Sequence, residues 1–325
     1  MIRTRCYRDG AVGEEAFDPA EISELLREPD TLVWMDVTDP SPEEFALIAE
    51  EFTLNPLAVE DALSGGQRPK VDHYDDHLFI SLYDVELDEE TAGLESAEIG
   101  VFAAPRYLVT VRQNDRFPMD EVVQRWDDTS HLAKHGIGFL LWGLLDVVVD
   151  SHFETVQRLD DEVDKLEDLL FDRRPRSQEV QRRSFEQRKS LVLLRRVVLP
   201  MREVLNVLMR RGQFDLVGGD LMPYYQDVYD HVLRATDWTD SLRDLVATIL
   251  ETNLTIQSNR MNEIMKAVTS WAAIAAVPTV ITGYYGMNVH TWPHAGTLVG
   301  GLVALGLCIV GVAVLYVMFK RREWL

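Results

Sequence analysis

Two uncharged stretches decide the fold of this 325-residue chain: Ala267-Val-Thr-Ser-Trp-Ala-Ala-Ile-Ala-Ala-Val-Pro-Thr-Val-Ile-Thr-Gly-Tyr-Tyr285 and Thr297-Leu-Val-Gly-Gly-Leu-Val-Ala-Leu-Gly-Leu-Cys-Ile-Val-Gly-Val-Ala-Val-Leu-Tyr-Val-Met-Phe319. They are 19 and 23 residues long and contain no Lys, Arg, Asp or Glu. A helix needs about 20 apolar residues to cross a hydrocarbon core about 30 Å thick, so each stretch is predicted to span a membrane. The 11 residues between them are so few that they predict an antiparallel hairpin.

The basic residues beside these stretches predict the orientation of the hairpin. Arg260 and Lys266 precede the first stretch and Lys320-Arg321-Arg322 follows the second, whereas the linker contains neither Lys nor Arg. Because cytoplasmic flanks carry the excess of Lys and Arg, both termini are predicted to lie in the cytosol, on a multi-pass protein of the cell (inner) membrane. Polar and acidic residues follow Met1–Arg5, so no cleavable signal peptide is predicted.

The composition limits the partners. The chain has 54 acidic and 32 basic side chains, a formal charge of −22, so cations rather than nucleic acid are the expected partners. Cys6 and Cys308 lie in the predicted soluble part and in the final apolar stretch, which makes a mutual disulfide implausible and leaves no metal-ligand spacing. No nucleophile constellation, phosphate-binding loop or His/Cys cluster is visible, so we do not predict an enzyme.

The residues before the hairpin predict an α+β fold. Residues 1–135 are interpreted as a cytosolic α/β domain. The expected strands, rich in β-branched and aromatic residues, are 31–37, 77–87, 97–103 and 107–112, the last two as an antiparallel pair. The expected helices, each opened by a capping residue before a proline, are 19–27, 42–52 and 56–63.

Longer helices are predicted to follow. Residues 136–222 are interpreted as a helical hairpin packed with the cytosolic domain, its helices near 137–171 and 177–211. The apolar start of the first helix is too short for a span because Asp146 interrupts it. From Pro223 there is no further Pro or Gly until Pro278, which predicts one helix roughly 80 Å long. We divide the remainder into a stalk (223–266), a pore-lining span (267–288), a periplasmic loop (289–296), a second span (297–319) and a basic tail (320–325).

A seven-residue repeat runs along the predicted long helix. Stepping back in sevens gives two neighbouring rows: Gly286, Thr279, Ala272, Met265, Ser258, Glu251, Asp244, Asp237 and Asp230; and Gly283, Ala276, Thr269, Asn262, Thr255, Thr248, Ser241, Arg234 and Asp227. Such a repeat keeps one face inward when parallel helices supercoil left-handedly. These rows, called the polar seam below, are acidic, then polar, then small or hydroxylated.

The polar seam favours a hydrated cation path around an axis of identical subunits. A solvated stalk face, a tight helix contact and a simple tail anchor remain alternatives. Because the spans carry no charge, selectivity must come from carbonyls, amides and hydroxyls, which suits an ion that keeps its water shell, as Mg²⁺ does. The residues alone do not choose among Mg²⁺, Co²⁺, Ni²⁺ and Zn²⁺.

At Tyr285-Gly286-Met287-Asn288 the chain closely resembles the CorA family, whose signature is Gly-Met-Asn at the outer end of the first of two C-terminal spans. Its position strengthens the match, as do Asn262–Lys266, the Pro278-Thr279…Gly283 pattern, Phe319–Leu325 and Gln67-Arg-Pro-Lys-Val-Asp72. The resemblance covers most of the chain.

The resemblance implies a funnel-shaped homopentamer in the membrane lipid, with the first span lining the pore and the second packed outside it. It implies a selectivity filter at Gly286, Met287 and Asn288, where a ring of Asn288 amides receives the hydrated ion. It also implies that Gly283, Thr279, Ala276, Val268 and Met265 line the pore, the inner ones as a hydrophobic gate. Asn262 joins them through the polar seam.

The resemblance further implies potential-driven influx of Mg²⁺, or of Co²⁺ or Ni²⁺, inhibited by intracellular Mg²⁺ at subunit interfaces. By position Glu251 matches one regulatory ligand, Asp227 is a second candidate, and Asp88 is the expected partner, although a solvated turn explains Asp88 as well. Two departures stand out: His294 replaces an expected acidic residue, and Ala276 replaces a bulkier one. The alternatives are the related zinc-transporter branch, which has Val in place of Met287, and a membrane-tethered metal sensor without conduction.

Overall fold

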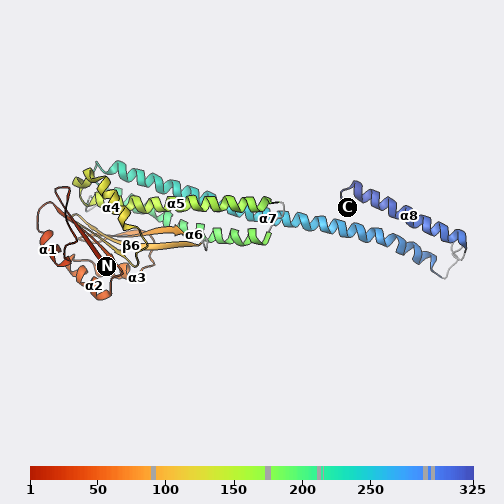
Figure 1. Ribbon diagram of the computed structural model, residues 1–325, viewed down its shortest axis with the longest axis horizontal. Coiled ribbons are helices and arrows are strands. Elements are labelled where there is room, and N and C mark those ends of the chain that lie inside the picture. Colours follow the sequence, from red (N-terminus) through yellow and green to blue (C-terminus); the bar gives the residue numbers. More distant parts are fainter. Residues whose placement is uncertain (89–92, 173–176, 211–213, 215, 288–291, 294–296) are drawn as a thin grey trace. The chain divides into compact units, whose positions relative to one another are not determined.

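The computed structural model describes residues 1–325 except 89–92, 173–176, 211–213, 215, 288–291 and 294–296 (Figure 1). The chain forms two compact units, Met1–Ile249 and Leu250–Leu325. The first contains a mixed sheet with helices and the second contains the end of one long helix and the last helix. The predicted fold class is therefore confirmed.

The first unit is built on a seven-stranded sheet of order β2-β1-β3-β7-β6-β5-β4. The strands are β1 (Ile2–Arg8), β2 (Ala11–Glu15), β3 (Thr31–Thr38), β4 (Lys70–His73), β5 (Leu78–Leu87), β6 (Leu94–Ala104) and β7 (Tyr107–Arg112). β3 and β7 run parallel, and the other neighbours are antiparallel. The four predicted strands are confirmed, including the antiparallel pairing of β6 with β7.

Strands β1, β2 and β4 were not predicted. In β1 the charged Arg5 is buried, because its guanidinium pairs with Asp127 at 2.7 Å and with Glu15 at 2.5 Å. A strand that buries an arginine lacks the apolar alternation by which strands are recognised in sequence. Its burial depends on carboxylates that are distant in sequence.

The short helices of the first unit begin where their caps predict. α2 (Pro42–Glu51) starts with a capping box, in which the Glu44 amide donates to Ser41 Oγ at 3.2 Å and the Ser41 amide donates to Glu44 Oε2 at 2.9 Å. In α3 (Pro56–Ser64) the Leu57 amide donates to the Asn55 side chain at 2.9 Å.

The predicted helix 19–27 is too long. It forms only η1 (Pro19–Glu21) and α1 (Ile22–Leu25), because the amides of Arg27 and Glu28 donate to carbonyls three residues earlier, at 3.0 and 3.2 Å, and α-helical bonding does not continue. α4 (Met119–Asp128) and η2 (Ser130–His135) were not predicted.

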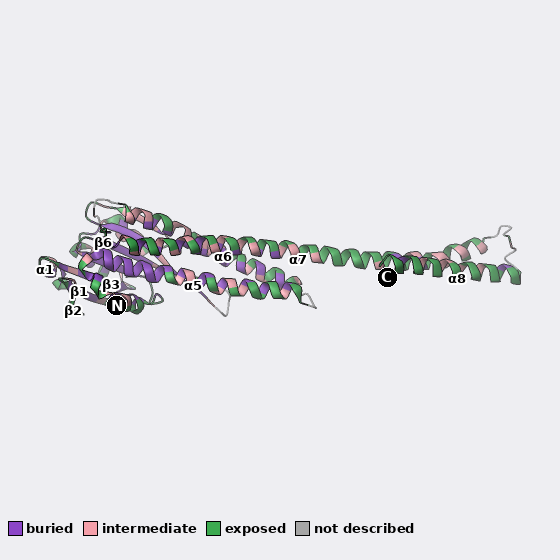
Figure 2. Ribbon diagram, turned by 90° about the horizontal axis from the view of Figure 1, so that it is seen from above, coloured by how far each residue is buried: buried purple, intermediate pink, exposed green. Residues whose placement is uncertain are grey.

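Two long helices, α5 (Ile137–Phe171) and α6 (Ser177–Met209), follow the sheet. The apolar start of α5 is buried, as Figure 2 shows, so it is a core helix as predicted. α5 lies along β5: His152 Nε2 is 2.7 Å from the Tyr83 carbonyl oxygen, and Thr155 Oγ1 donates to the Val85 carbonyl at 2.8 Å. Full burial lowers the pKa of His152 to about 4.

α7 (Met222–Tyr285) is a single helix of 64 residues, about 96 Å long at 1.5 Å per residue, and it continues through Pro278. Within the first unit one side of α7 is buried, at Tyr225, Val228, Val232, Ala235, Thr239, Leu242, Val246 and Ile249. This side packs on the first unit. The long helix predicted from the absence of Pro and Gly is confirmed.

The second unit holds the last part of α7 beside α8 (Leu298–Arg321). The two helices approach closely at Gly311, where a Cβ would lie 2.7 Å from Val277 Cγ1. Both helices are long and apolar enough to cross a membrane, with mean hydropathy of 1.6 for α7 and 2.7 for α8 over their most apolar 18 residues. α8 extends to Arg321 and so includes the start of the predicted basic tail.

Candidate functional site: the polar seam of α7

Every residue of the polar seam, from Asp227 to Gly286, is exposed in the chain. In the first unit the seam lies opposite the buried side of α7. Seam positions follow the buried residues Tyr225, Val232 and Val246 by two and by five residues. Because each residue turns the helix by about 100°, both spacings lead to its opposite side. The predicted seam is thus a free surface of the single chain. No described residue of its own subunit buries any of these side chains.

The seven-residue period has a geometric consequence. On a straight α-helix each step of seven falls about 20° short of two turns. From Asp230 to Gly286 there are eight such steps, a drift of about 160°. The whole seam faces one axis only if α7 supercoils left-handedly, as helices with this period do around identical partners.

Four hydroxyl groups of the seam, those of Ser241, Thr248, Thr255 and Thr279, have their hydrogens occupied. Thr279 Oγ1 donates to the Ala275 carbonyl at 3.1 Å, and Thr255 Oγ1 donates to the Glu251 carbonyl at 3.0 Å. Ser241 and Thr248 donate in the same way to the carbonyls four residues earlier. The oxygen of each of these four hydroxyls is therefore left as an acceptor. Water molecules bound to a cation turn their hydrogens outward, so a row of acceptors suits a hydrated cation.

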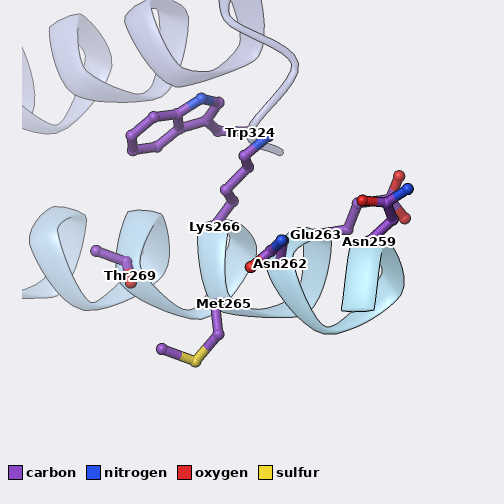
Figure 3. A pocket seen from close by; sticks show the side chains of 7 residues that line it. All are labelled: Asn259, Asn262, Glu263, Met265, Lys266, Thr269 and Trp324. Carbon is purple, nitrogen blue, oxygen red and sulfur yellow. The ribbon is translucent and has the colours of Figure 1, made fainter. Parts of the chain in front are cut away.

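Apolar residues interrupt the polar surface near the start of the predicted span. Met265 and Val268 are exposed by 57% and 59%. In Figure 3 the Met265 side chain points away from Lys266 and Trp324, which lie on the other side of α7. An exposed apolar pair at this level is the kind of group that closes a water path by dewetting.

The far end of α7 carries the signature. The Gly286 amide donates to the Thr282 carbonyl at 2.8 Å, and the Met287 amide donates to the Tyr284 carbonyl at 3.3 Å, so the backbone keeps helical hydrogen bonding up to the signature. Met287 is 56% exposed. A Cβ at Gly283 would meet nothing within 4 Å, so no described contact of this chain requires glycine there. Asn288, His290 and His294 lie outside the described residues.

The three predicted regulatory carboxylates do not meet within one chain. Asp88 directly follows β5 and is half-buried, and its amide donates to the Gly93 carbonyl at 2.9 Å. Asp227 and Glu251 are exposed on α7, 24 residues or about 36 Å apart along the helix. Among the described residues, no group of three or more His, Cys, Asp or Glu side chains is close enough to hold a metal ion.

A groove beside the polar seam was not predicted from the sequence. It has a volume of about 540 Å³ and is lined by Asn259, Asn262, Glu263, Met265, Lys266, Thr269 and Trp324. Figure 3 shows the Lys266 side chain reaching from α7 toward Trp324. The Trp324 indole stacks on Phe319, with ring centroids 5.7 Å apart. The seam residues Asn262 and Thr269 therefore stand next to the folded-back end of the chain.

Comparison with known proteins shows the family. The family described as "CorA-like Mg2+ transporter protein" matches residues 29–321. The chain belongs to the CorA family. The cobalt/magnesium transport protein CorA of Thermotoga maritima is 31% identical to this chain over 313 residues, which cover 95% of this chain and 88% of that protein.

More distant members agree. The solved structure of the CorA magnesium transporter from Methanocaldococcus jannaschii has the same fold, with a TM-score of 0.80 at 24% identity over 100% of this chain and 99% of that one. The zinc transport protein ZntB of Yersinia pseudotuberculosis is 24% identical over 294 residues, 90% of this chain and 86% of that protein. The CorA family consists of membrane proteins that transport metal ions, a class distinct from enzymes.

Proposed function

We propose that the protein is a channel for hydrated divalent cations, chiefly Mg²⁺ and also Co²⁺ or Ni²⁺, which enter the cytosol down the membrane potential. The observation that carries this proposal is the polar seam, which is exposed along all of its length on one continuous helix. The path is formed by α7 helices of several copies around one axis, five by resemblance to the family. α8 packs outside, against lipid.

The chemistry of the path follows from its residues. The exposed carboxylates Asp230, Asp237, Asp244 and Glu251 concentrate cations at the cytosolic end. Within the span, Thr279, Ala276 and Gly283 offer acceptor oxygens and small side chains to the water shell, with no charge that would bind the ion too tightly. We assign entry selectivity to Gly286, Met287 and Asn288, whose amide both donates and accepts hydrogen bonds.

The gate is assigned to Met265 and Val268, with Asn262 beyond them on the cytosolic side. Intracellular Mg²⁺ binds Asp88 of one copy and Glu251 or Asp227 of another, which is why one chain does not assemble the site. The bound ion offsets repulsion among these acids and favours the closed arrangement; loss of the ion favours opening.

The topology of the proposal rests on the basic flanks. Residues 1–266 and 320–325 are placed in the cytosol, 267–288 and 297–319 in the bilayer and 289–296 in the periplasm. Arg260, Lys266 and Lys320–Arg322 lie on the cytosolic side, where the positive-inside rule puts them.

Flux into proteoliposomes tests the proposal. The expected result is Mg²⁺ uptake that falls when internal Mg²⁺ rises and that is lost in Asn288→Ala, while the control Asn259→Ala, an exposed amide of α7 outside the polar seam, conducts normally. Wild-type vesicles without divalent flux would contradict it. Such a result would leave a membrane-tethered sensor as the better reading.

Zn²⁺ transport is a second candidate, favoured by the similarity to the zinc transport protein ZntB. The zinc-transporter branch has Val at the place of Met287, so the signature of this chain favours Mg²⁺. Uptake measured with Mg²⁺ and Zn²⁺ in competition separates the two. Preference for Zn²⁺ by the wild type would replace the first proposal with the second.

A further inference from the structure

An apolar groove on α8 ends at two arginines. Its volume is about 530 Å³, and its lining is Ala313, Val314, Val317, Met318, Arg321 and Arg322. All six residues are exposed. They form two adjacent rows in which each residue follows the previous one by four positions, and residues four apart lie on the same side of a helix. The groove spans ten residues, from Ala313 to Arg322, a rise of about 14 Å, which is close to half of a hydrocarbon core about 30 Å thick.

The two arginines have no acidic partner in the described part of the chain. No ion pair joins Arg321 or Arg322 to a carboxylate among the described residues, although the chain has 54 acidic side chains. The acids lie elsewhere: residues 1–249 hold 51 acidic and 27 basic side chains, whereas residues 250–325 hold three acidic and five basic ones. The guanidinium pair is thus free to bind an external anion.

The helix end holds this pair beside the groove. The Arg322 amide donates to the carbonyls of Met318 at 3.2 Å and Phe319 at 3.1 Å, and the Trp324 amide donates to the Phe319 carbonyl at 3.0 Å. The stacking of Trp324 on Phe319 closes the turn. Lys320 differs, since its ammonium lies over the Tyr316 ring, 5.8 Å from the centroid, and does not line the groove.

We propose that this groove binds an anionic phospholipid of the cytoplasmic leaflet. The phosphate is held by Arg321 and Arg322, whose planar guanidinium groups match phosphate oxygens, and one acyl chain lies along Ala313, Val314, Val317 and Met318. Apolar and cationic parts occur in the order in which a phospholipid presents acyl chain and phosphate. The inference rests on the proposed placement of α8 in the bilayer.

Lipid retention tests the inference. The full-length protein in detergent is given equal amounts of phosphatidylglycerol and phosphatidylethanolamine, and bound lipid is counted by native mass spectrometry. Wild type is expected to retain phosphatidylglycerol preferentially. Each of Arg321→Gln and Arg322→Gln is expected to lower that retention about tenfold, since a hydrogen bond between a guanidinium and a phosphate contributes about 1.5 kcal/mol. Lys320→Gln removes the same charge outside the groove and is expected to change little.

A second variant leaves every charge in place. Val317→Trp fills the groove and is expected to lower retention of phosphatidylglycerol with both arginines present. Wild-type retention in the double variant Arg321→Gln/Arg322→Gln would overturn the inference, as would an equal loss in Lys320→Gln. Displacement of the lipid by inorganic phosphate at the same concentration would show a site for free phosphate instead. Because no readout uses ion flux, failure here is distinct from failure of the channel proposal.

Discussion

α7 is one helix with two different surroundings. Up to Ile249 it has a buried side, on which Tyr225, Val232 and Leu242 are at most 3% exposed. Beyond Leu250 six of its large apolar side chains, those of Leu254, Met261, Met265, Val268, Trp271 and Val280, are 53–69% exposed, whereas Ile274 is buried. The first part is held by a core of its own chain. The second part has exposed apolar residues, as expected of a segment that lipid or other copies of the chain cover.

The largest expected effect is a difference between the two parts of α7 in how much a truncated leucine lowers the free energy of unfolding. Leu242→Ala empties space in the core of the first unit and should lower its free energy of unfolding by about 2–5 kcal/mol. Leu254→Ala, 12 residues further along the same helix, should leave it nearly unchanged because Leu254 is exposed. Denaturant unfolding followed by tryptophan fluorescence measures both. Equal losses would mean that the two parts do not differ as described.

A pH effect is expected from the first unit. Burial lowers the pKa of His152 to about 4 from an ordinary 6.5 and also lowers that of His77. Between pH 6.5 and about pH 4 the His152 ring is protonated in the unfolded chain but not in the folded chain. The free energy of unfolding is therefore highest above about pH 6.5 and falls as the pH drops toward 4. For His152 the loss is up to about 3 kcal/mol. The free energy of unfolding, measured at pH 7 and at pH 5, should differ less between the two pH values in His152→Gln than in the wild type. The same difference in both proteins would show that His152 does not cause the pH dependence.

The hydroxyls of the second part should matter for conduction and not for folding. Thr279→Val keeps the shape but removes an acceptor from the polar seam, and Mg²⁺ flux should fall about fivefold for a lost hydrogen bond of about 1 kcal/mol. Thr282→Val is the matched control, since Thr282 Oγ1 also donates to a backbone carbonyl but lies off the seam. Stopped-flow uptake compares them. A greater loss of Mg²⁺ flux in Thr282→Val than in Thr279→Val would mean that a different face of α7 lines the cation path.

The smallest expected effect is on regulation. Asp88→Lys and Glu251→Lys should each shift inhibition by internal Mg²⁺ to higher concentration by several-fold, because a carboxylate that binds Mg²⁺ becomes a cation. Glu263→Lys reverses an exposed charge of α7 off the seam and serves as control. Flux against internal Mg²⁺ gives the three curves. If the inhibition curves of all three variants coincide, Asp88 and Glu251 do not form the regulatory Mg²⁺ site.

Elements that depend on neighbouring residues in the sequence, such as helix starts, were predictable. Ser41 and Asn55 fixed the starts of α2 and α3, and the run without Gly or Pro predicted α7. Strand β1 was missed because its Arg5 is satisfied by Asp127, 122 residues away. The fold-back of Trp324 was missed too, since it depends on Glu323 adopting a positive φ of 57°. Asp88, Asp227 and Glu251 stay a prediction, because the site assigned to them needs more than one copy of the chain.

The most direct test of the central claim, that the polar seam lines the cation path, uses two adjacent alanines. Ala275 and Ala276 are both exposed, but only Ala276 belongs to the seam, and the two side chains point about 100° apart. In a Cys308→Ser background, a cationic thiol reagent is applied to Ala276→Cys and Ala275→Cys while Mg²⁺ uptake is recorded. The account predicts block of uptake in Ala276→Cys and none in Ala275→Cys. Block in Ala275→Cys with uptake unaffected in Ala276→Cys would contradict it.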